Sequence, residues 1–350
     1  MNKFKNFFSK YWIFILLAAI ATILAGFYFK NKISPPQVSE KLLSLSIPEI
    51  ESSPIAVTLN VSPLEKNFPS FPQKLEVYQV TSPSFSNQEA IKIAQGLGFQ
   101  DKPLIFNDVK GPLYTWSGDI NNLSINLHEG KISYGLDLLN HPEIVKGAPP
   151  PLSEAETKTK EFLIEKGFSP PEKVRLEIKE SYYAKAVGSY FEKSSLEDKE
   201  TTLTHLMLEY KINNRRVAGS ELISVSIYIG AEFKIIRFDY QPSFKKIELL
   251  DFYPLKTKEE IIQNIKSEPQ ISFIKTSKNY LEDYLPTKET SQNITSLTFE
   301  NIELVYYKYD PLQVYLQPVF LITGKAILKN GQEGGVSFYL PAIKEEYLLK

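Results

Sequence analysis

A helix-like sequence occurs twice in this chain, and this repeat limits the possible folds more than any other feature. Residues 86–99 read SNQEAIKIAQGLGF and residues 153–168 read SEAETKTKEFLIEKGF. Each copy opens with Ser-x-x-Glu, a capping box in which the serine and the glutamate satisfy two backbone N–H groups at a helix start. Each copy ends in Gly-Phe, where the glycine suits a left-handed position and the phenylalanine can fold back onto the helix. The repeat therefore predicts two helices that start and stop in the same way.

Strand-like segments follow these helices and also resemble one another. LSINL at 123–127, VSIYI at 225–229 and VSFYL at 336–340 place apolar residues at their first, third and fifth positions. This alternation is typical of half-buried strands in antiparallel sheets. A weaker third helix start, Thr257 with Glu260, precedes the last of them. We predict an α+β fold in which an antiparallel sheet covered by a helix is repeated in tandem; the alternative is that common caps and strands match by coincidence.

The N-terminal sequence predicts where the protein is located. Residues 11–29, YWIFILLAAIATILAGFYF, contain no charged residue. As a helix they would extend about 28 Å, which is close to the hydrocarbon thickness of a bilayer. A slight excess of lysine before this run favours a cytoplasmic N-terminus. We expect a single-pass protein of the cell membrane that contacts the lipid bilayer through residues 11–29, with its bulk extracytoplasmic; a cleaved signal peptide and a buried core helix are the alternatives.

Proline-rich segments suggest how the rest of the chain is divided. One of them lies at 33–54, and a run of three prolines at 149–151 directly precedes the second copy of the helix sequence. Such segments commonly separate domains. The expected organisation is a cytoplasmic tail and transmembrane anchor at 1–32, a Pro-rich stalk at 33–54, and α+β modules at 55–148, 149–254 and, as a partial copy, 255–350.

Composition and motifs argue against several classes of function. The formal net charge is −1, so the chain lacks the excess of basic residues expected of a protein that binds nucleic acid. It has no cysteine, which excludes disulfides, thiol catalysis and thiolate metal sites. His128, His141 and His205 lack metal-ligand spacing and are interpreted as surface or turn histidines, and the S-x-x-K match at Ser243–Lys246 does not open a helix. We expect a protein that is not an enzyme, with no catalytic residue, metal site or cofactor.

The aromatic segment at 303–320, ELVYYKYDPLQVYLQPVF, is the main candidate for a binding surface. In a strand, Tyr307 and Tyr309 would share one face and Tyr306 would lie on the other. If one face packs against the core, the other would expose tyrosines that bind a partner or stack on a glycan. The alternative is a strand buried on both faces. The predicted partner-binding residues are Tyr306, Tyr307 and Tyr309, and capture of an extended peptide at a sheet edge is a further possibility.

A helix that opens on Ser-x-x-Glu, closes on Gly-Phe and is followed by a β-meander resembles the PepSY-like domains. The whole layout, with the apolar N-terminal segment and the tail YLQPVFLITGKAILKNGQEGGVSFYLPAI (315–343), is similar to the membrane-anchored YycH/YycI-type regulators, which associate with a sensor histidine kinase. The resemblance implies a non-enzymatic envelope protein whose extracytoplasmic domains bind and regulate or scaffold another envelope protein, a sensor kinase among the candidates. The alternatives are a cell-wall-processing enzyme or protease inhibitor, and a glycan-binding module.

Overall fold

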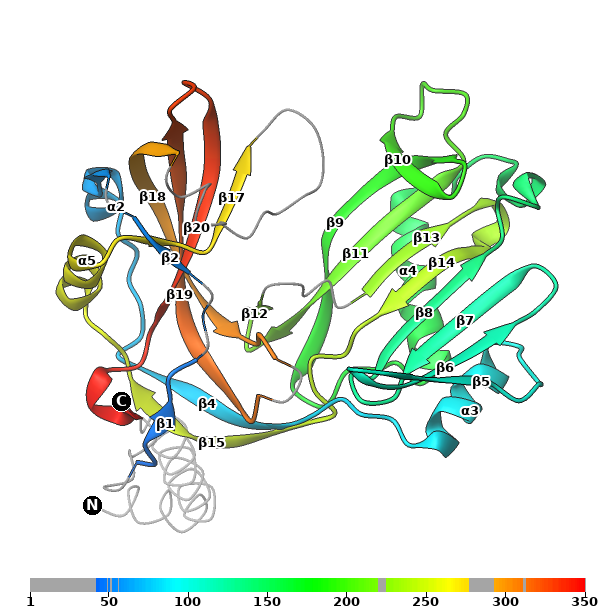
Figure 1. The fold of residues 1–350 in the computed structure, drawn as a ribbon, viewed down its shortest axis with the longest axis horizontal. Coiled ribbons are helices and arrows are strands. Elements are labelled where there is room, and N and C mark those ends of the chain that lie inside the picture. The colour runs from blue at the N-terminus through cyan, green and yellow to red at the C-terminus, as the bar shows by residue number, and fades with distance from the viewer. Residues whose placement is uncertain are drawn as a thin grey trace, which may run out of the picture. The chain divides into compact units, whose positions relative to one another are not determined.

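The computed structural model describes residues 42–48, 50, 52–55, 57–219, 225–276, 293–310 and 313–349. The fold is α+β and consists mostly of strands with a few helices, as Figure 1 shows. The described residues from Leu43 onward form one compact unit. The elements below all belong to this unit. The α+β class predicted from the alternating strands and capped helices is therefore confirmed.

One sheet is built from strands between residues 104 and 240. It is antiparallel throughout, with the strand order β5-β6-β7-β8-β14-β13-β11-β9-β10. VSIYI at 225–229 is a strand as predicted, and LSINL lies largely within another. The strands are β5 (Leu104–Asp108), β6 (Gly111–Ser117), β7 (Asn121–Asn126), β8 (Lys131–Leu136), β9 (Val174–Val187), β10 (Tyr190–Ser194), β11 (Leu203–Ile212), β13 (Val225–Ile229) and β14 (Ile235–Tyr240).

Two helices, α3 (Asn87–Gly96) and α4 (Leu152–Glu165), lie on the same face of this sheet (Figure 1). Both contribute to one hydrophobic core, in which Ala90 of α3 and Ala155 and Leu163 of α4 are buried beside the inward side chains of the sheet. The two copies of the repeated sequence thus cover one continuous sheet.

The two helices end in the same way, as the repeat predicts. Gly98 and Gly167 have φ angles of 96° and 76°, a left-handed conformation that costs glycine little. The N–H of Phe99 donates to Ala94 O at 2.9 Å, and the N–H of Phe168 donates to Leu163 O at 2.7 Å. This bond pattern is a Schellman motif. Both phenylalanines are buried, so each Gly-Phe pair ends its helix and adds a ring to the core.

The helix starts agree with the sequence at two of three positions. α3 has the predicted capping box: Glu89 N–H donates to Ser86 Oγ at 3.2 Å, and Ser86 N–H donates to the Glu89 carboxylate at 2.7 Å. The same box opens α5 (Lys258–Ser267), with Thr257 as the cap. α4 instead begins at Leu152 with Pro151 as its N-cap and no side-chain cap. The box predicted at Ser153 is absent because α4 already begins at Leu152, which places Ser153 inside the helix and not at its cap.

The second sheet contains the C-terminal strands. β17-β20-β19-β18 are antiparallel neighbours, β3 and β12 pair with β18 in parallel, and β4 pairs with both β15 and β19. Leu64 of α2 (Ser62–Lys66) and Ile261 and Ile265 of α5 are buried in its core. VSFYL lies in β20, as predicted. The strands are β3 (Thr58–Asn60), β4 (Lys74–Thr81), β12 (Arg215–Ala218), β15 (Lys246–Pro254), β17 (Phe273–Thr276), β18 (Ile294–Tyr307), β19 (Tyr315–Leu328) and β20 (Glu333–Pro341).

The described residues between 43 and 55 are part of the folded unit and differ in this from the stalk predicted at 33–54. β1 (Leu45–Ser46) pairs in parallel with β21 (Leu348–Leu349), and β2 (Ser53–Pro54) pairs with β16 (Gln270–Ile271). Leu45 is fully buried. The hydroxyl of Tyr253 donates to Leu43 O at 2.8 Å. Burial of an apolar side chain and backbone pairing hold this segment on the domain surface, although it is rich in proline.

The predicted cytoplasmic tail and transmembrane anchor at 1–32, which include the bilayer segment 11–29, lie outside the described residues, as do stalk residues 33–41. Among the residues that the structure describes, no helix has both the length and the apolar character needed to span a membrane.

The predicted module boundaries at 148/149 and 254/255 do not separate independent sheets. β8 pairs with β14 through Ile132–Tyr240 and three further residue pairs, which joins the first predicted module to the second. β4 pairs with β15 and β19, which lie in the second and third. If the modules were separate, the edges of these strands would be exposed. The edges are instead paired with one another, which removes sites for unwanted association.

Candidate partner-binding surface

The structure buries two of the three tyrosines predicted to bind a partner. Tyr306 is fully buried and Tyr307 is 2% exposed, so the end of β18 is packed on both faces. Tyr306 packs edge-to-face against Tyr78 with ring centroids 5.5 Å apart, and its hydroxyl donates to Glu76 O at 3.2 Å. Tyr307 lies on the other face, in a cluster with Tyr339. The expected exposure is not found for these two residues because neighbours from distant strands cover both faces.

Tyr309, the third predicted residue, is half-buried just beyond the end of β18. Its ring stacks on Tyr307 with a centroid distance of 6.5 Å and an interplanar angle of 9°. Its N–H donates to the Gln313 side chain at 3.0 Å, and it lines a surface hollow of about 290 Å³. Of the three tyrosines, Tyr309 is therefore the one that could contact another molecule.

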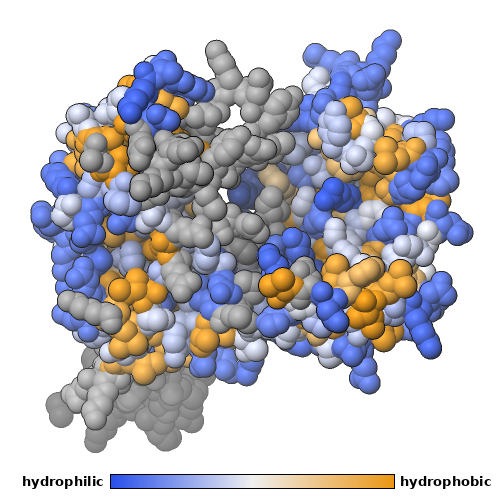
Figure 2. Space-filling view, in the orientation of Figure 1, coloured by the Kyte–Doolittle hydropathy of each residue, from blue (hydrophilic) through white to orange (hydrophobic). Residues whose placement is uncertain are grey.

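Exposed apolar side chains gather at a different place, on the edge strand β5. Leu104, Ile105 and Phe106 are 64%, 57% and 53% exposed. β5 pairs with β6 on one side, and no strand of the described residues pairs with its other side. Figure 2 shows a hydrophobic area on the surface in the region of β5 and β6. An edge strand presents a row of N–H and C=O groups that can pair with another chain, and most proteins protect such edges with lysine, proline or a bulge. Leu-Ile-Phe carries none of these.

The neighbours of β5 explain why the strand is held in place although its own side chains are exposed. Gly111, with φ 104°, is the first residue of β6 and directly follows the two-residue turn at 109–110. The indole N–H of the buried Trp116 donates to Asp101 O at 3.0 Å, which ties down the segment just before β5. Leu104 and Phe106 face away from α3, because they pair with Thr115 and Leu113 rather than with the core residue Tyr114. The strand is thus a fixed apolar edge.

The face of the sheet opposite α3 and α4 is polar. Register aligns one row of side chains across five strands, so that each residue lies directly opposite the next. Within the row, Ser133 Oγ donates to Asp239 Oδ1 at 2.5 Å; Arg237, two residues before Asp239 on β14, donates from Nε to Asp239 Oδ2 at 2.8 Å. The row therefore presents hydroxyl and charged groups on the face opposite α3 and α4. Its members are Thr115, Ser124, Ser133, Asp239 and Ser226.

His205 lies on the same face and is buried, which corrects the interpretation as a surface histidine. It is 2% exposed, and its ring stacks on Tyr228 with centroids 4.0 Å apart while Tyr182 packs edge-on at 4.6 Å. Burial lowers the pKa of His205 to about 4, so the ring is neutral at pH 7. In the sequence, His205 alternates with Met207, Glu209 and Lys211, opposite apolar residues, which is consistent with its place on the polar face. The two tyrosines that cover it come from β9 and β13, and this pairing is not visible in the sequence.

The contact between His205 and Ser226 resembles part of a nucleophilic triad. Nε2 of His205 lies 2.9 Å from Ser226 Oγ. A catalytic histidine also needs an acidic partner on its second ring nitrogen. Nδ1 of His205 is buried and has no hydrogen-bond partner in the described part of the chain, and Asp239 is engaged by Ser133 and Arg237. The described residues also contain no group of three side chains able to hold a metal ion. This geometry favours a structural role for the pair.

A hollow of about 500 Å³ lies over β7, β8 and β14 on the polar face. Asn122, Ser124, Ser133 and Arg237 supply hydrogen-bonding groups to it, and Phe191 of the β9–β10 hairpin supplies an aromatic wall. Phe191 is itself held by stacking on Tyr228, with centroids 4.1 Å apart. The side chains that line the hollow can therefore accept hydrogen bonds from a ligand and donate hydrogen bonds to it, and Phe191 can cover an apolar surface of the ligand.

Comparisons with known proteins do not place the chain in a family. Neither a protein-family model nor a curated protein matches it. Among solved structures, the chain is similar to an uncharacterized protein from Eubacterium rectale ATCC 33656, with a TM-score of 0.45, 10% sequence identity, and coverage of 81% of this chain and 86% of that one. This similarity assigns neither a family nor a function.

Proposed function

We propose that the chain is a non-enzymatic envelope protein, anchored in the cell membrane by residues 11–29, whose extracytoplasmic domain binds and regulates or scaffolds another envelope protein. The observation that carries the binding function is the exposed apolar edge strand β5. The resemblance to PepSY-like domains and to YycH/YycI-type regulators supports the regulatory role and makes a sensor kinase one candidate partner. The repeated helix sequence with its matching Gly-Phe ends supports the same relation.

The proposed mode of binding is addition of an extended partner segment to β5. Main-chain hydrogen bonds along the open edge would supply affinity, and alternate side chains would supply specificity. Leu104 and Phe106 point to one face and Ile105 to the other, so the matching segment carries apolar residues on both faces. Removing these side chains from water would contribute about 25 cal/mol per Å² of apolar area buried.

The experiment is in-cell crosslinking with mass spectrometry on the full chain, comparing the parent with Phe106→Glu and Ile164→Glu. Ile164 is a matched control because it is 69% exposed on α4, away from the edge. We expect a defined envelope protein to be crosslinked by the parent and by the Ile164 variant, and to be lost from the Phe106 variant. Equal recovery from all three, or recovery of only a second copy of this chain, would refute edge binding of a partner.

A second candidate function, glycan binding, is supported by the hollow on the polar sheet face. Its hydroxyl, amide and guanidinium groups can pair with sugar hydroxyls, and Phe191 can cover an apolar sugar face. Calorimetric titration with soluble cell-wall glycan fragments tests this. Glycan binding that is weakened in the Asn122→Ala variant and unchanged in the Phe106→Glu variant would support this function. A titration of the folded parent that shows no heat of binding would refute it.

A further inference from the structure

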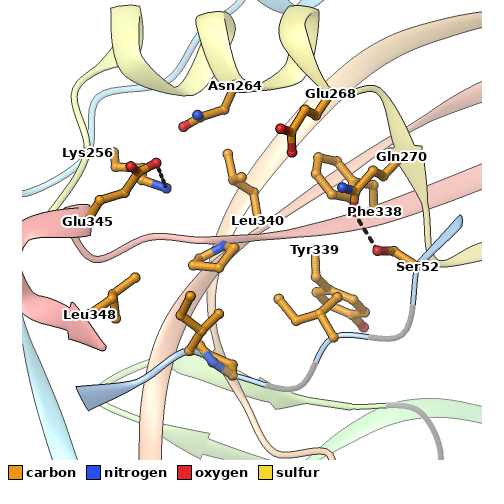
Figure 3. Close-up of a pocket in the computed structure, with 14 residues that line it drawn as sticks. Ser52, Lys256, Asn264, Glu268, Gln270, Phe338, Tyr339, Leu340, Glu345 and Leu348 are labelled. Atoms are coloured by element: carbon orange, nitrogen blue, oxygen red, sulfur yellow. Dashed lines mark hydrogen bonds and ion pairs between the residues drawn. The ribbon is translucent and has the colours of Figure 1, made fainter. Parts of the chain in front are cut away.

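A pocket of about 350 Å³ lies between α5, the end of β20 and the N-terminal segment that contains β1 and β2 (Figure 3). Its floor is apolar: Leu340 occupies the centre, and Leu348 lies at one side. Both leucines are largely buried, so most of their surface already packs against the protein. The remaining apolar lining residues are Ile47, Pro48, Ile50, Phe338, Tyr339 and Pro341.

The rim of this pocket is polar and is built mainly by α5 and the residues after it. Asn264 and Glu268 extend from α5 toward the pocket in Figure 3. Gln270 follows and accepts a hydrogen bond from Ser52 Oγ at 2.5 Å, which closes one end. The pocket thus has an apolar floor and hydrogen-bonding groups at its mouth.

The charged residues that line the pocket carry an excess of one negative charge. Glu268 and Glu345 line it, opposed by Lys256 alone among the lining residues. The Lys256 side chain is only 7% exposed, and its Nζ lies 3.8 Å from the Glu345 carboxylate. Burial lowers the pKa of Lys256, and the Glu345 and Glu260 carboxylates oppose this shift. Glu345 therefore already has a cationic partner, and Glu268 carries the excess charge.

Two further features favour a cation near Glu268. Glu268 is the C-cap of α5, and the carbonyl groups at a helix C-terminus carry partial negative charge. The nearby lysines are paired elsewhere: Lys266 Nζ lies 2.6 Å from the Glu65 carboxylate, and Lys344 Nζ lies 3.8 Å from that of Glu260. An incoming anion would meet two carboxylates and this helix end, which disfavours it.

We propose that this pocket binds a primary ammonium group on a short aliphatic stem, such as a lysine side chain presented by a peptide. The stem lies on Leu340 and Leu348, and the ammonium group donates to Glu268 and to the side-chain oxygen of Asn264. A volume of about 350 Å³ is at the low end of small-ligand pockets, and suits one side chain better than a large ligand. The site is independent of β5, so it stands or falls separately from the proposed function.

The test is NMR-monitored titration of the full chain in detergent with Nα-acetyl-lysine amide and Nα-acetyl-norleucine amide. The two probes have similar stems and differ in the ammonium group. We expect the lysine probe to bind more tightly and to shift resonances of Leu340 and Glu268. Glu268→Gln should weaken the lysine probe by about threefold, the size of an exposed ion pair, and leave the norleucine probe unchanged. Glu259→Gln, an exposed α5 position outside the pocket, should change neither.

Ionic strength provides a second readout, because screening should reduce the preference for lysine over norleucine. Equal binding of the two probes would show an apolar pocket without charge selection and would overturn the proposal. Saturation that is insensitive to Glu268→Gln, or absence of shifts at pocket residues in the folded chain, would overturn it as well.

Discussion

Replacing Tyr306 tests most sharply whether β18 is a core strand. Its side chain is fully buried, packs on Tyr78 and donates to the Glu76 carbonyl at 3.2 Å. Tyr306→Ala removes the whole ring and leaves a cavity, and Tyr306→Phe removes only the hydroxyl. The pair of variants therefore separates packing from hydrogen bonding.

The expected magnitudes follow from these contacts. Truncating a buried aromatic ring to alanine costs about 3–5 kcal/mol in free energy of unfolding. Losing the hydroxyl bond, which leaves the Glu76 carbonyl short of one donor, costs about 1 kcal/mol. We expect about 4 kcal/mol for Tyr306→Ala and about 1 kcal/mol for Tyr306→Phe. Tyr190→Ala is the control, because Tyr190 is 56% exposed and its loss should cost less than about 1 kcal/mol.

The assay is urea unfolding of the full chain in detergent, followed by far-UV circular dichroism. A loss of less than about 1 kcal/mol for Tyr306→Ala, or a loss equal to that of Tyr190→Ala, would refute the burial of this ring. It would also restore the sequence-based prediction that Tyr306 lies on a surface.

Two other predictions concern backbone packing and pH. An added Cβ at Gly324 would lie 2.0 Å from Thr298 O, so Gly324→Ala should lower the free energy of unfolding by about 3 kcal/mol. Gly96→Ala, with no atom within 4 Å, should raise it by about 0.5 kcal/mol; equal effects in urea unfolding would contradict this. The pKa of His205 is lowered from 6.5 to about 4, so the unfolded chain binds more protons in that interval and stability falls as pH falls. His205→Phe should remove up to about 3 kcal/mol of that pH dependence, and an unchanged slope between pH 6.5 and 4 would contradict the burial.

Local chemistry made the helix ends and several strands predictable. The caps at Ser86 and Thr257 and the Gly-Phe stops depend on residues within six positions of one another, and all are confirmed. The cap predicted at Ser153 is absent because the helix begins before the serine, at Leu152 after Pro151. The rules for caps thus work where one local signal dominates.

The features that the sequence did not predict depend on contacts between strands that are far apart in the chain. Tyr306 is covered by Tyr78 of β4, and His205 by Tyr182 and Tyr228, through contacts between strands far apart in sequence. The exposed edge at Leu104–Asp108 was missed for the same reason. A short apolar run is compatible with a core strand until its lack of an outer neighbour is known.

The most direct test of the proposed function is a photocrosslinking amino acid placed at Phe106 in the full chain in cells, with Ile164 as the control position. Binding of a partner segment along β5 predicts a discrete heterologous protein adduct from position 106 and none from position 164. No adduct at position 106, or the same adducts at both positions, would contradict the claim that this edge strand is the binding surface.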